Sequence, residues 1–321
     1  MQLIRGLTNL LALAGQPDSP LRQGCVATIG NFDGVHLGHQ TIVDQVRDKA
    51  RQLGVPAVVM VFEPQPREYF EGDQAPPRLT AFRQKWQALL QHGTDIVVCL
   101  RFNERFRQYS GQGFIEDVLV GGLQIRHLVV GDDFRFGCDR SGDFDLLKAQ
   151  GVVFGYTVER TRTVMVAGER VSSTRVRDCL QSGDLAQAAS LLGEPYGIEG
   201  RVVYGRQLGR QLDAPTANIR LARMPALRGV YVVTATTAEG DRYHGVANIG
   251  LRPTVDGKHP ALEAHLFGFA GSLYGQRLRV SFRHFLRGEQ KFDNVEALKA
   301  QILEDITQAR AWLACQPTSI D

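Results

Sequence analysis

The sequence predicts a two-domain protein: an α/β half with a parallel sheet, followed by an antiparallel β-barrel with a terminal helix. The 321 residues suffice for about two domains of roughly 150 residues each. The first half alternates Val- and Ile-rich runs with helical stretches, which is typical of βαβ units. The second half has short strand patterns separated by Gly, Pro, Asp and Asn, which favours an antiparallel barrel.

Strand patterns in the first half occupy 25–29, 57–62, 96–100 and 128–130. Helical patterns occupy 36–53, where Gly54 ends the helix, and lie near 80–92 and 113–121. Strands and helices therefore alternate along this half. Because ligands of parallel sheets bind at the carboxyl ends of the strands, chemistry is expected in the segments that follow each strand.

The second half contains strand patterns at 201–204, 229–236, 243–249, 262–267 and 277–282. Apolar residues then recur with a helical period over 295–313, which predicts an amphipathic terminal helix with Asn294 as its N-cap. An Ala- and Leu-rich helix pattern covers 185–192. We place the domains at 1–185 and 186–321.

Charge and cysteine usage exclude several classes of protein. Residues 1–185 carry 21 basic and 21 acidic side chains, and residues 186–321 carry 16 and 13, giving a net charge of +3. Neither half has the dense basic surface of a nucleic-acid-binding protein, so no nucleic-acid partner is expected. The five cysteines form no Cys-x-x-Cys pair. This argues against a zinc ribbon or a disulfide framework and favours a cytoplasmic setting.

No membrane partner is expected either. The apolar run at 10–14 follows a single positive charge, Arg5, and we interpret it as a face of a helix or loop rather than a signal peptide. No apolar stretch reaches the roughly 20 residues of a membrane-spanning helix. Nothing in the sequence implies an obligate protein partner.

The most informative segment is Thr-Ile-Gly-Asn-Phe-Asp-Gly-Val-His-Leu-Gly-His at 28–39, which follows the first strand and opens the first helix. A helix N-terminus suits phosphate, and Gly30 and Gly34 allow a tight turn and close backbone approach. His36 and His39 are three residues apart and share a helix face, while Gly38 between them leaves room for a nucleotide. A zinc site lacks a third ligand at recognisable spacing.

His-x-Gly-His after a first strand resembles the Rossmann-like nucleotidyltransferases, which include small-molecule adenylyltransferases and class I tRNA synthetases. The resemblance implies a second phosphate-binding segment late in the domain, and the hydroxyls and guanidinium of 172–175 fit it. It assigns catalysis to His36, His39 and Arg175. It assigns nucleotide binding to Gly30, Asn31, Asp33, Gly38, Ser172, Ser173 and Thr174.

The second half carries Pro-Thr-Ala-Asn at 215–218, Gly-Val-Ala-Asn-Ile-Gly-Leu-Arg-Pro-Thr at 245–254 and Leu-Glu-Ala-His-Leu at 262–266. These segments resemble the riboflavin kinase domain. The whole chain therefore resembles the bacterial bifunctional riboflavin kinase/FAD synthetase (FMN adenylyltransferase) family. The resemblance implies a general base at Glu263, Mg²⁺ ligands at Thr216 and Asn218, and a nucleotide contact at Gly209. Flavin contacts are implied at Arg252 and Asp293.

One departure from the family pattern concerns the kinase. Asp213-Ala214 stands where the family usually has Gly-Phe before Pro-Thr-Ala-Asn. A negative charge near the expected phosphates puts the efficiency of the kinase in doubt. A second departure, Phe269-Ala270-Gly271-Ser272 where an acidic residue is more usual, falls in a loop expected to tolerate the change.

A flavin site in the first domain is expected after its second and fourth predicted strands. Phe62 opens the first of these segments, 62–66, and Asp133 and Phe136 belong to the second, 131–137. Both segments resemble parts of the family that line the acceptor pocket, and the two aromatic rings could stack on an isoalloxazine. Packing of both phenylalanines in the core is an equally good interpretation.

The predicted function is the synthesis of flavin cofactors. Riboflavin and ATP give FMN and ADP in the second domain, and FMN and ATP give FAD and pyrophosphate in the first, with Mg²⁺ needed at both. Riboflavin, FMN and ATP are then the partners. Two alternatives stay open: adenylyl transfer alone with a degraded kinase, and a flavin- or nucleotide-binding regulator without turnover.

Overall fold

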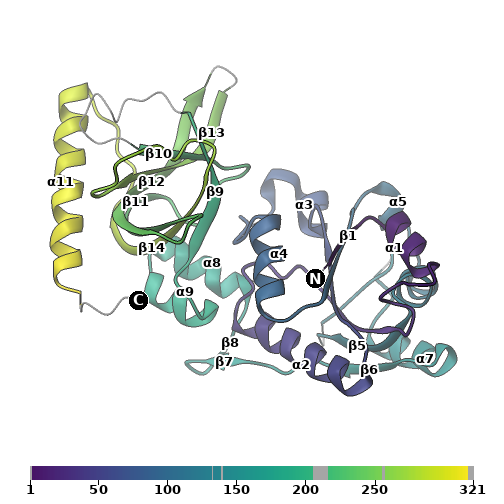
Figure 1. Cartoon of the computed structure of the whole chain (residues 1–321). Helices are drawn as coiled ribbons and strands as arrows, with labels where there is room; N and C mark the ends of the chain where they lie inside the picture. Colours follow the sequence, from purple (N-terminus) through teal and green to yellow (C-terminus); the bar gives the residue numbers. More distant parts are fainter. Residues whose placement is uncertain (1, 132, 139, 205–215, 255–256, 317–321) are drawn as a thin grey trace. The chain divides into compact units, whose positions relative to one another are not determined.

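The computed structural model describes residues 2–131, 133–138, 140–204, 216–254 and 257–316. The chain divides into two compact units (Figure 1). The first comprises Met1–Pro76 and Thr80–Ser172, and the second comprises Pro77–Leu79 and Ser173–Asp321.

The first unit alternates strands and helices as the sequence predicts. Its strands are β1 (Gln2–Arg5), β2 (Cys25–Ile29), β3 (Ala57–Phe62), β4 (Ile96–Leu100), β5 (Ile125–Val130), β6 (Thr157–Arg160) and the short pair β7 (Met165–Val166) and β8 (Glu169–Arg170). Its helices are α1 (Leu7–Ala14), α2 (Leu37–Leu53), α3 (Pro66–Glu71), η1 (Gly72–Gln74), α4 (Phe82–Gln91), α5 (Glu104–Arg107), α6 (Gly111–Gly113), the π-type helix η2 (Phe114–Gly122) and α7 (Phe144–Phe154).

Six parallel strands form its sheet in the order β1-β4-β3-β2-β5-β6. The chain adds β3 and β4 on one side of β2, and then β5 and β6 on the other. The strand order therefore reverses next to β2. In open parallel sheets ligands bind at such a switch point, outside the carboxyl ends of the strands. The segment that follows β2 lies at this position.

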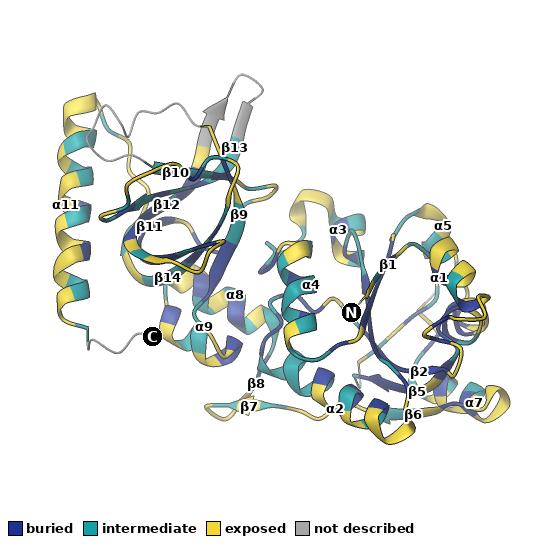
Figure 2. Ribbon diagram, in the orientation of Figure 1, coloured by how far each residue is buried: buried dark blue, intermediate teal, exposed yellow. Residues whose placement is uncertain are grey.

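The sheet is buried on both faces because successive side chains point to opposite sides. Ala27 and Ile29 pack with α1 and η2 in one core cluster. Val26 packs with α2 on the other face, and Val59 packs with α2 and α4. Figure 2 shows the strands as the most buried layer of this unit. The strongly apolar strands predicted from the sequence are thus explained by double-sided burial.

The second unit is a closed barrel accompanied by helices. It contains the strands β9 (Gly197–Val203), β10 (Thr216–Arg220), β11 (Gly229–Thr237), β12 (Arg242–Thr254), β13 (Gly257–Leu266) and β14 (Arg277–Arg287), and the helices α8 (Ser173–Ser182), α9 (Leu185–Leu192) and α11 (Val295–Ala314). All six strand pairings are antiparallel, and the order β10-β13-β12-β11-β14-β9 closes on itself.

Helix α11 packs along the outside of the barrel (Figure 1). The Asn294 side chain accepts a hydrogen bond from Ala297 N at 2.7 Å, so the predicted N-cap is confirmed. Asp305, which is 3% exposed, ties the helix to β14. Its two carboxylate oxygens accept hydrogen bonds from Arg287 Nε at 2.8 Å and Nη2 at 2.7 Å.

Over the described part of the chain, no helix combines the length and apolarity needed to cross a membrane. The two-domain α/β plus β-barrel architecture predicted from the sequence is confirmed.

Candidate active sites

The loop between β2 and α2 has an uncommon backbone. Phe32 has φ 47°, Gly34 φ 86° and Val35 φ 43°. Residues other than glycine rarely adopt a positive φ angle. For a β-branched residue such as valine, this backbone conformation carries a steric cost. Both non-glycine residues are nonetheless buried, Phe32 at 2% and Val35 at 4% exposure. The loop is therefore held in a conformation that the surrounding packing must enforce.

The two predicted histidines stack at the N-terminus of α2. Their ring centroids lie 3.7 Å apart at an interplanar angle of 15°. His36 is the N-cap residue, and its Nδ1 accepts a hydrogen bond from His39 N at 3.3 Å. A neutral His36 ring in this arrangement carries its proton on Nε2. The structure thus brings both imidazoles together where free helix N–H groups favour an anion.

The electrostatics of His39 favour its neutral form. Burial, the neighbouring His36 and the positive charge of Lys85 together hold the pKa of His39 well below its ordinary value of 6.5. His39 Nδ1 is buried without a hydrogen-bond partner among the described residues. At neutral pH the ring is therefore an uncharged imidazole, with one nitrogen able to donate and the other able to accept.

Two anchors that the sequence did not reveal hold the loop. Thr80 donates from its backbone N–H and its hydroxyl to Asp33 Oδ1 at 3.1 and 3.3 Å. The same hydroxyl accepts from Gly34 N at 3.1 Å. On α4, Lys85 Nζ donates to the Asn31 carbonyl at 2.6 Å. Asp33, predicted as a nucleotide contact, is 1% exposed and orders the loop from inside.

The glycines of this motif have close neighbours within the protein. A Cβ on Gly38 would lie 3.2 Å from two atoms of the His36 ring. A Cβ on Gly30 would lie 3.1 Å from the Phe32 ring. The lack of a side chain at Gly38 therefore makes room for the imidazole ring of His36. The sequence alone explained this glycine only by the room that a nucleotide needs.

The second predicted phosphate segment spans the division between the two units. Ser172 ends the first unit, whereas Ser173, Thr174 and Arg175 begin α8 in the second. Their joint action with His36 and His39 stays a prediction.

The predicted flavin residues Phe62 and Phe136 belong to one aromatic cluster at the carboxyl ends of the strands. The Phe62 ring lies 5.3 Å from Phe106, which lies 6.3 Å from Phe114. Phe114 in turn lies 5.3 Å from Phe136. Phe136 is only 8% exposed and packs in the core. Asp133, by contrast, is an exposed residue in the turn after β5.

On the barrel, three predicted kinase residues share one region of β10 and β13. Asn218 pairs directly with Glu263, and Thr216 pairs with His265. Glu263 also pairs with Asn248 on β12. Val246, two residues before Asn248 on the same strand, packs against α11 outside the barrel. Asn248 points to the same side of β12 as Val246, and directly paired residues share a face of the sheet. The side chains of Asn218, Glu263 and Asn248 therefore form a row on the outer wall of the barrel. Asn248 lies in one of the sequence motifs, but only the strand register shows that it stands opposite Glu263.

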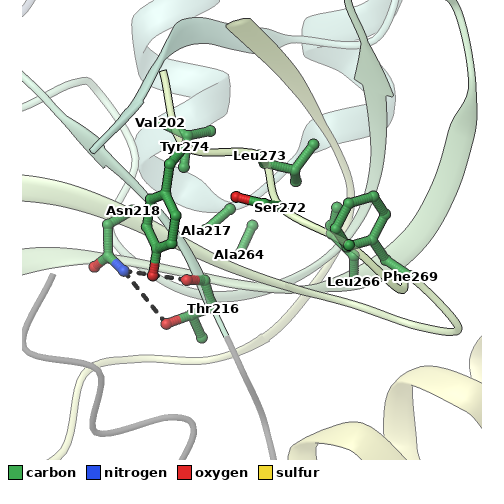
Figure 3. Close-up of a pocket in the computed structure, with 11 residues that line it drawn as sticks. Val202, Thr216, Ala217, Asn218, Ala264, Leu266, Phe269, Ser272, Leu273 and Tyr274 are labelled. Carbon is green, nitrogen blue, oxygen red and sulfur yellow. Dashed lines mark hydrogen bonds between the residues drawn. The ribbon is translucent and has the colours of Figure 1, made fainter. Parts of the chain in front are cut away.

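A cavity of about 100 Å³ adjoins this row (Figure 3). Thr216 and Asn218 line it from β10, and Phe269, Leu273 and Tyr274 line it from the loop after β13. The Asn218 amide nitrogen donates to the Thr216 carbonyl at 3.2 Å and lies 3.5 Å from its hydroxyl. Figure 3 shows Tyr274 pointing toward both residues. The cavity has a polar end of hydroxyl and amide groups and an apolar remainder.

Some predicted residues give no side-chain geometry. Gly209 and the Asp213-Ala214 departure lie outside the described residues, as does the side chain of Arg252. Asp293 is described and exposed, shortly before α11. Within the described ranges no group of three or more His, Cys, Asp or Glu side chains could hold a metal ion.

The fold and the two sites define an enzyme that transfers phosphorus-containing groups, with a nucleotide-binding α/β unit and a barrel. The family model described as FAD synthetase matches residues 18–175, and the one described as riboflavin kinase matches residues 192–313. The chain belongs to the family of bifunctional riboflavin kinase/FMN adenylyltransferases.

Curated relatives match nearly the full length. A Pseudomonas fluorescens protein described as bifunctional riboflavin kinase/FMN adenylyltransferase is 52% identical, covering 98% of both chains. An Escherichia coli K12 protein of the same description is 46% identical, covering 97% of both. A solved Streptococcus pneumoniae chain described as a macrolide-efflux protein has a TM-score of 0.77 at 29% identity, covering 97% of this chain and 99% of that one. This last similarity shows that the two chains share a fold.

The predicted family and the two predicted enzyme activities, which make FMN and FAD, are thereby confirmed. The interpretations as a non-catalytic regulator or as a protein with only one activity find no support in these matches.

Proposed function

We propose that the first unit adenylylates FMN through His36 and His39, and that the second phosphorylates riboflavin with Glu263 as the general base. The observation that supports this best is the placement of each set of residues. The stacked imidazoles lie at the switch point of the parallel sheet, and Glu263 lies in the outer-wall row beside Asn218.

In adenylyl transfer, a phosphate oxygen of FMN attacks the α-phosphorus of ATP, and the bond to pyrophosphate breaks. Charge develops on the leaving pyrophosphate and on the transferred group. The imidazole N–H groups of both histidines are proposed to donate hydrogen bonds to this charge and so stabilise the transition state. The N-terminus of α2 adds backbone donors in the same place. Arg175 and the hydroxyls of Ser172, Ser173 and Thr174 are proposed to bind the remaining phosphates, with Gly30, Asn31 and Asp33 forming the nucleotide loop.

In the kinase reaction, the ribityl 5′-hydroxyl attacks the γ-phosphorus of ATP, and ADP leaves. The Glu263 carboxylate takes the hydroxyl proton as the new bond forms. The cavity beside Thr216 and Asn218 is proposed to receive the nucleotide, because its polar end suits phosphates and its apolar part suits a base. Gly209, Arg252 and Asp293 remain proposed contacts to the nucleotide and the flavin.

The side-chain oxygens of Thr216 and Asn218 on β10 are of the type that binds a magnesium ion. The Asn218 amide nitrogen turns toward Thr216 in this structure, so the amide must rotate by a half-turn before its carbonyl oxygen and the Thr216 hydroxyl can face one ion. This oxygen and the Thr216 hydroxyl are hard ligands of the kind that Mg²⁺ accepts beside substrate phosphates. When bound, the ion would neutralise charge on those phosphates.

A flavin pocket in the first unit is proposed along the aromatic cluster. Phe62 is only partly buried and presents ring surface, whereas Phe136 supports the cluster from the core. Asp133 follows the carboxyl end of β5. It is proposed to contact the polar part of the flavin.

We further propose a division of the activities at residues 185/186. The two family models leave 176–191 between them, and the compact units divide at Ser172/Ser173. The substrates are small molecules, and we propose that the enzyme acts on them in the cytoplasm without a nucleic-acid, membrane or obligate protein partner.

Product analysis tests the proposal. The protein is incubated with riboflavin, ATP and Mg²⁺, and FMN and FAD are separated by chromatography. His36→Ala and His39→Ala should each lower FMN-to-FAD conversion by roughly 10²–10³, as expected for lost transition-state donors. Both variants should still produce FMN from riboflavin. Near-normal FAD formation by both would refute the assignment of the histidines.

A further inference from the structure

Lys85 is a buried lysine with no role in the chemistry described so far. It lies on α4, where its side chain is 0% exposed. Its Nζ donates a 2.6 Å hydrogen bond to the Asn31 carbonyl. Removing an ammonium group from water is costly unless polar partners compensate. A methionine would fill similar volume at lower cost, so a lysine here calls for an explanation in terms of what it contacts.

The hydrogen bond of Lys85 falls at the start of the strained loop. Asn31 immediately precedes Phe32, with φ 47°, and Val35 follows with φ 43°. Each such residue is strained and persists only where the surroundings fix it. Thr80 fixes the loop at Asp33 and Gly34. Lys85 fixes it one residue before the first strained position.

The same ammonium group acts on His39. Its positive charge disfavours a second positive charge on the imidazole and contributes to the lowered pKa of His39, after burial and His36. The His39 ring also lies 4.8 Å from the ring of Phe32. One side chain thus contacts the start of the loop and acts electrostatically on the histidine at its end.

We propose that Lys85 is a positioning residue for adenylyl transfer. By holding the Asn31 carbonyl, it keeps the loop in the shape that presents His36 and His39 as a stacked pair to the phosphates. The inference rests on the proposed role of these histidines. Because the alignment of the imidazoles matters most in the transition state, loss of Lys85 should lower kcat more than it raises the KM for ATP.

The test compares Lys85→Met with Lys85→Arg, which keeps the charge and the donor, and with Lys148→Met. Lys148 is an exposed lysine of the same unit and serves as the matched control. Lys85→Met should lower kcat of FMN adenylylation by about 10- to 100-fold, as expected for a displacement of about 1 Å or less. Lys85→Arg should recover part of this loss, and Lys148→Met should have no effect.

Two internal measurements separate positioning from misfolding. Riboflavin phosphorylation by the same chain should stay within twofold of the parent. Of the two tryptophans, Trp86 lies beside Lys85 on α4 and Trp312 on α11. In a Trp312→Phe background, Trp86 fluorescence therefore reports folding of the first unit, and kcat is referred to its folded fraction.

An unchanged kcat in folded Lys85→Met overturns the inference, as does an equal loss in Lys85→Arg and Lys85→Met. If Lys85→Met does not fold, Lys85→Leu decides by the same criterion, since it too lacks a donor for the Asn31 carbonyl. His36→Ala is measured alongside. If it is fully active, the proposed role of the histidines fails. If it is inactive while Lys85→Met is fully active, only the inference about Lys85 fails.

Discussion

Asn218 on β10 lies directly opposite Glu263 on β13, and Asn248 lies opposite the same glutamate from β12. The carboxylate is thus flanked by two amides on the outer wall of the barrel. Amide groups can orient a carboxylate by hydrogen bonding without neutralising it. A general base needs this combination of fixed position and retained charge.

Glu263→Gln should remove the base while preserving the size of the side chain. FMN formation from riboflavin should fall by about 10²–10⁴, the usual contribution of general base catalysis. Conversion of supplied FMN to FAD should not change. Separate assays of the two conversions check this, with Glu239→Gln, an exposed acid in the turn after β11, as control. A parallel loss of both activities in a folded variant would show that the two sites are wrongly assigned.

Gly38→Ala tests the packing of the histidine pair. The added Cβ would lie 3.2 Å from the His36 ring, so the ring must shift by a few tenths of an ångström. FAD formation should fall by up to about 10²-fold, because the imidazole is misplaced, while FMN formation continues. Gly15→Ala is the matched control, since its Cβ would meet only atoms at 3.8 Å. Equal FAD synthesis in both variants would contradict a positioned His36.

The stability of the first unit should fall as the pH drops below about 6.5, the ordinary pKa of histidine. The folded-state pKa of His39 is lowered by burial, His36 and Lys85, and that of His127 by burial and Lys49. The unfolded chain therefore binds more protons between each lowered pKa and 6.5, and stability is lost with acid across this window. The slope is at most about 1.4 kcal/mol per pH unit for each histidine.

Urea unfolding followed by Trp86 fluorescence, at pH values from 7.5 to 5.5, measures this dependence. His127→Asn should flatten the curve, since an asparagine does not titrate and can still hydrogen-bond to Thr157, the partner of His127 Nδ1 at 2.6 Å. A curve of equal slope in His127→Asn would remove His127 from the explanation. Rising stability toward acid would contradict the lowered pKa of both histidines.

The Arg287–Asp305 pair should contribute strongly to the stability of the second unit. Both side chains are largely buried, at 17% and 5% exposure, and the pair joins β14 to α11. Asp305→Ala leaves the guanidinium without its carboxylate and should cost about 3–5 kcal/mol in the free energy of unfolding. Trp312 fluorescence during urea unfolding measures it. Glu194→Ala, which breaks a more exposed pair with Arg279, should cost under about 1 kcal/mol. Similar costs for both would refute the distinction.

The strands that the sequence predicted best are buried on both faces. The three predicted strands at 25–29, 57–62 and 96–100 match β2, β3 and β4, because runs that are apolar except for Thr28 leave little alternative. β1 and β6 were missed because each has only four residues and includes polar ones. β10 was known only as a motif, since its Thr and Asn interrupt the apolar pattern.

In the site, as in the fold, the sequence predicted features that depend on neighbouring residues and missed those that depend on residues far apart in the chain. His36, Gly38 and His39 are neighbours in the chain, so spacing alone predicted their shared helix terminus. Lys85 and Thr80 reach the loop from 54 and 47 residues away. No local pattern marks them, because their importance arises only when α4 and the segment before it pack against the loop between β2 and α2. Asn248 likewise gains its meaning from strand register.

The alternation along β13 has a consequence for how this enzyme can change. Leu262 and Ala264 are fully buried, whereas Glu263 between them stands on the outer wall. Hydrophobic packing and the proposed proton transfer thus depend on alternate positions of one strand, with opposite side-chain directions. The interior of the barrel can therefore exchange apolar residues of similar volume over evolutionary time while the proposed general base keeps its place. Thermal tolerance and kinase chemistry could then evolve separately within the same three residues.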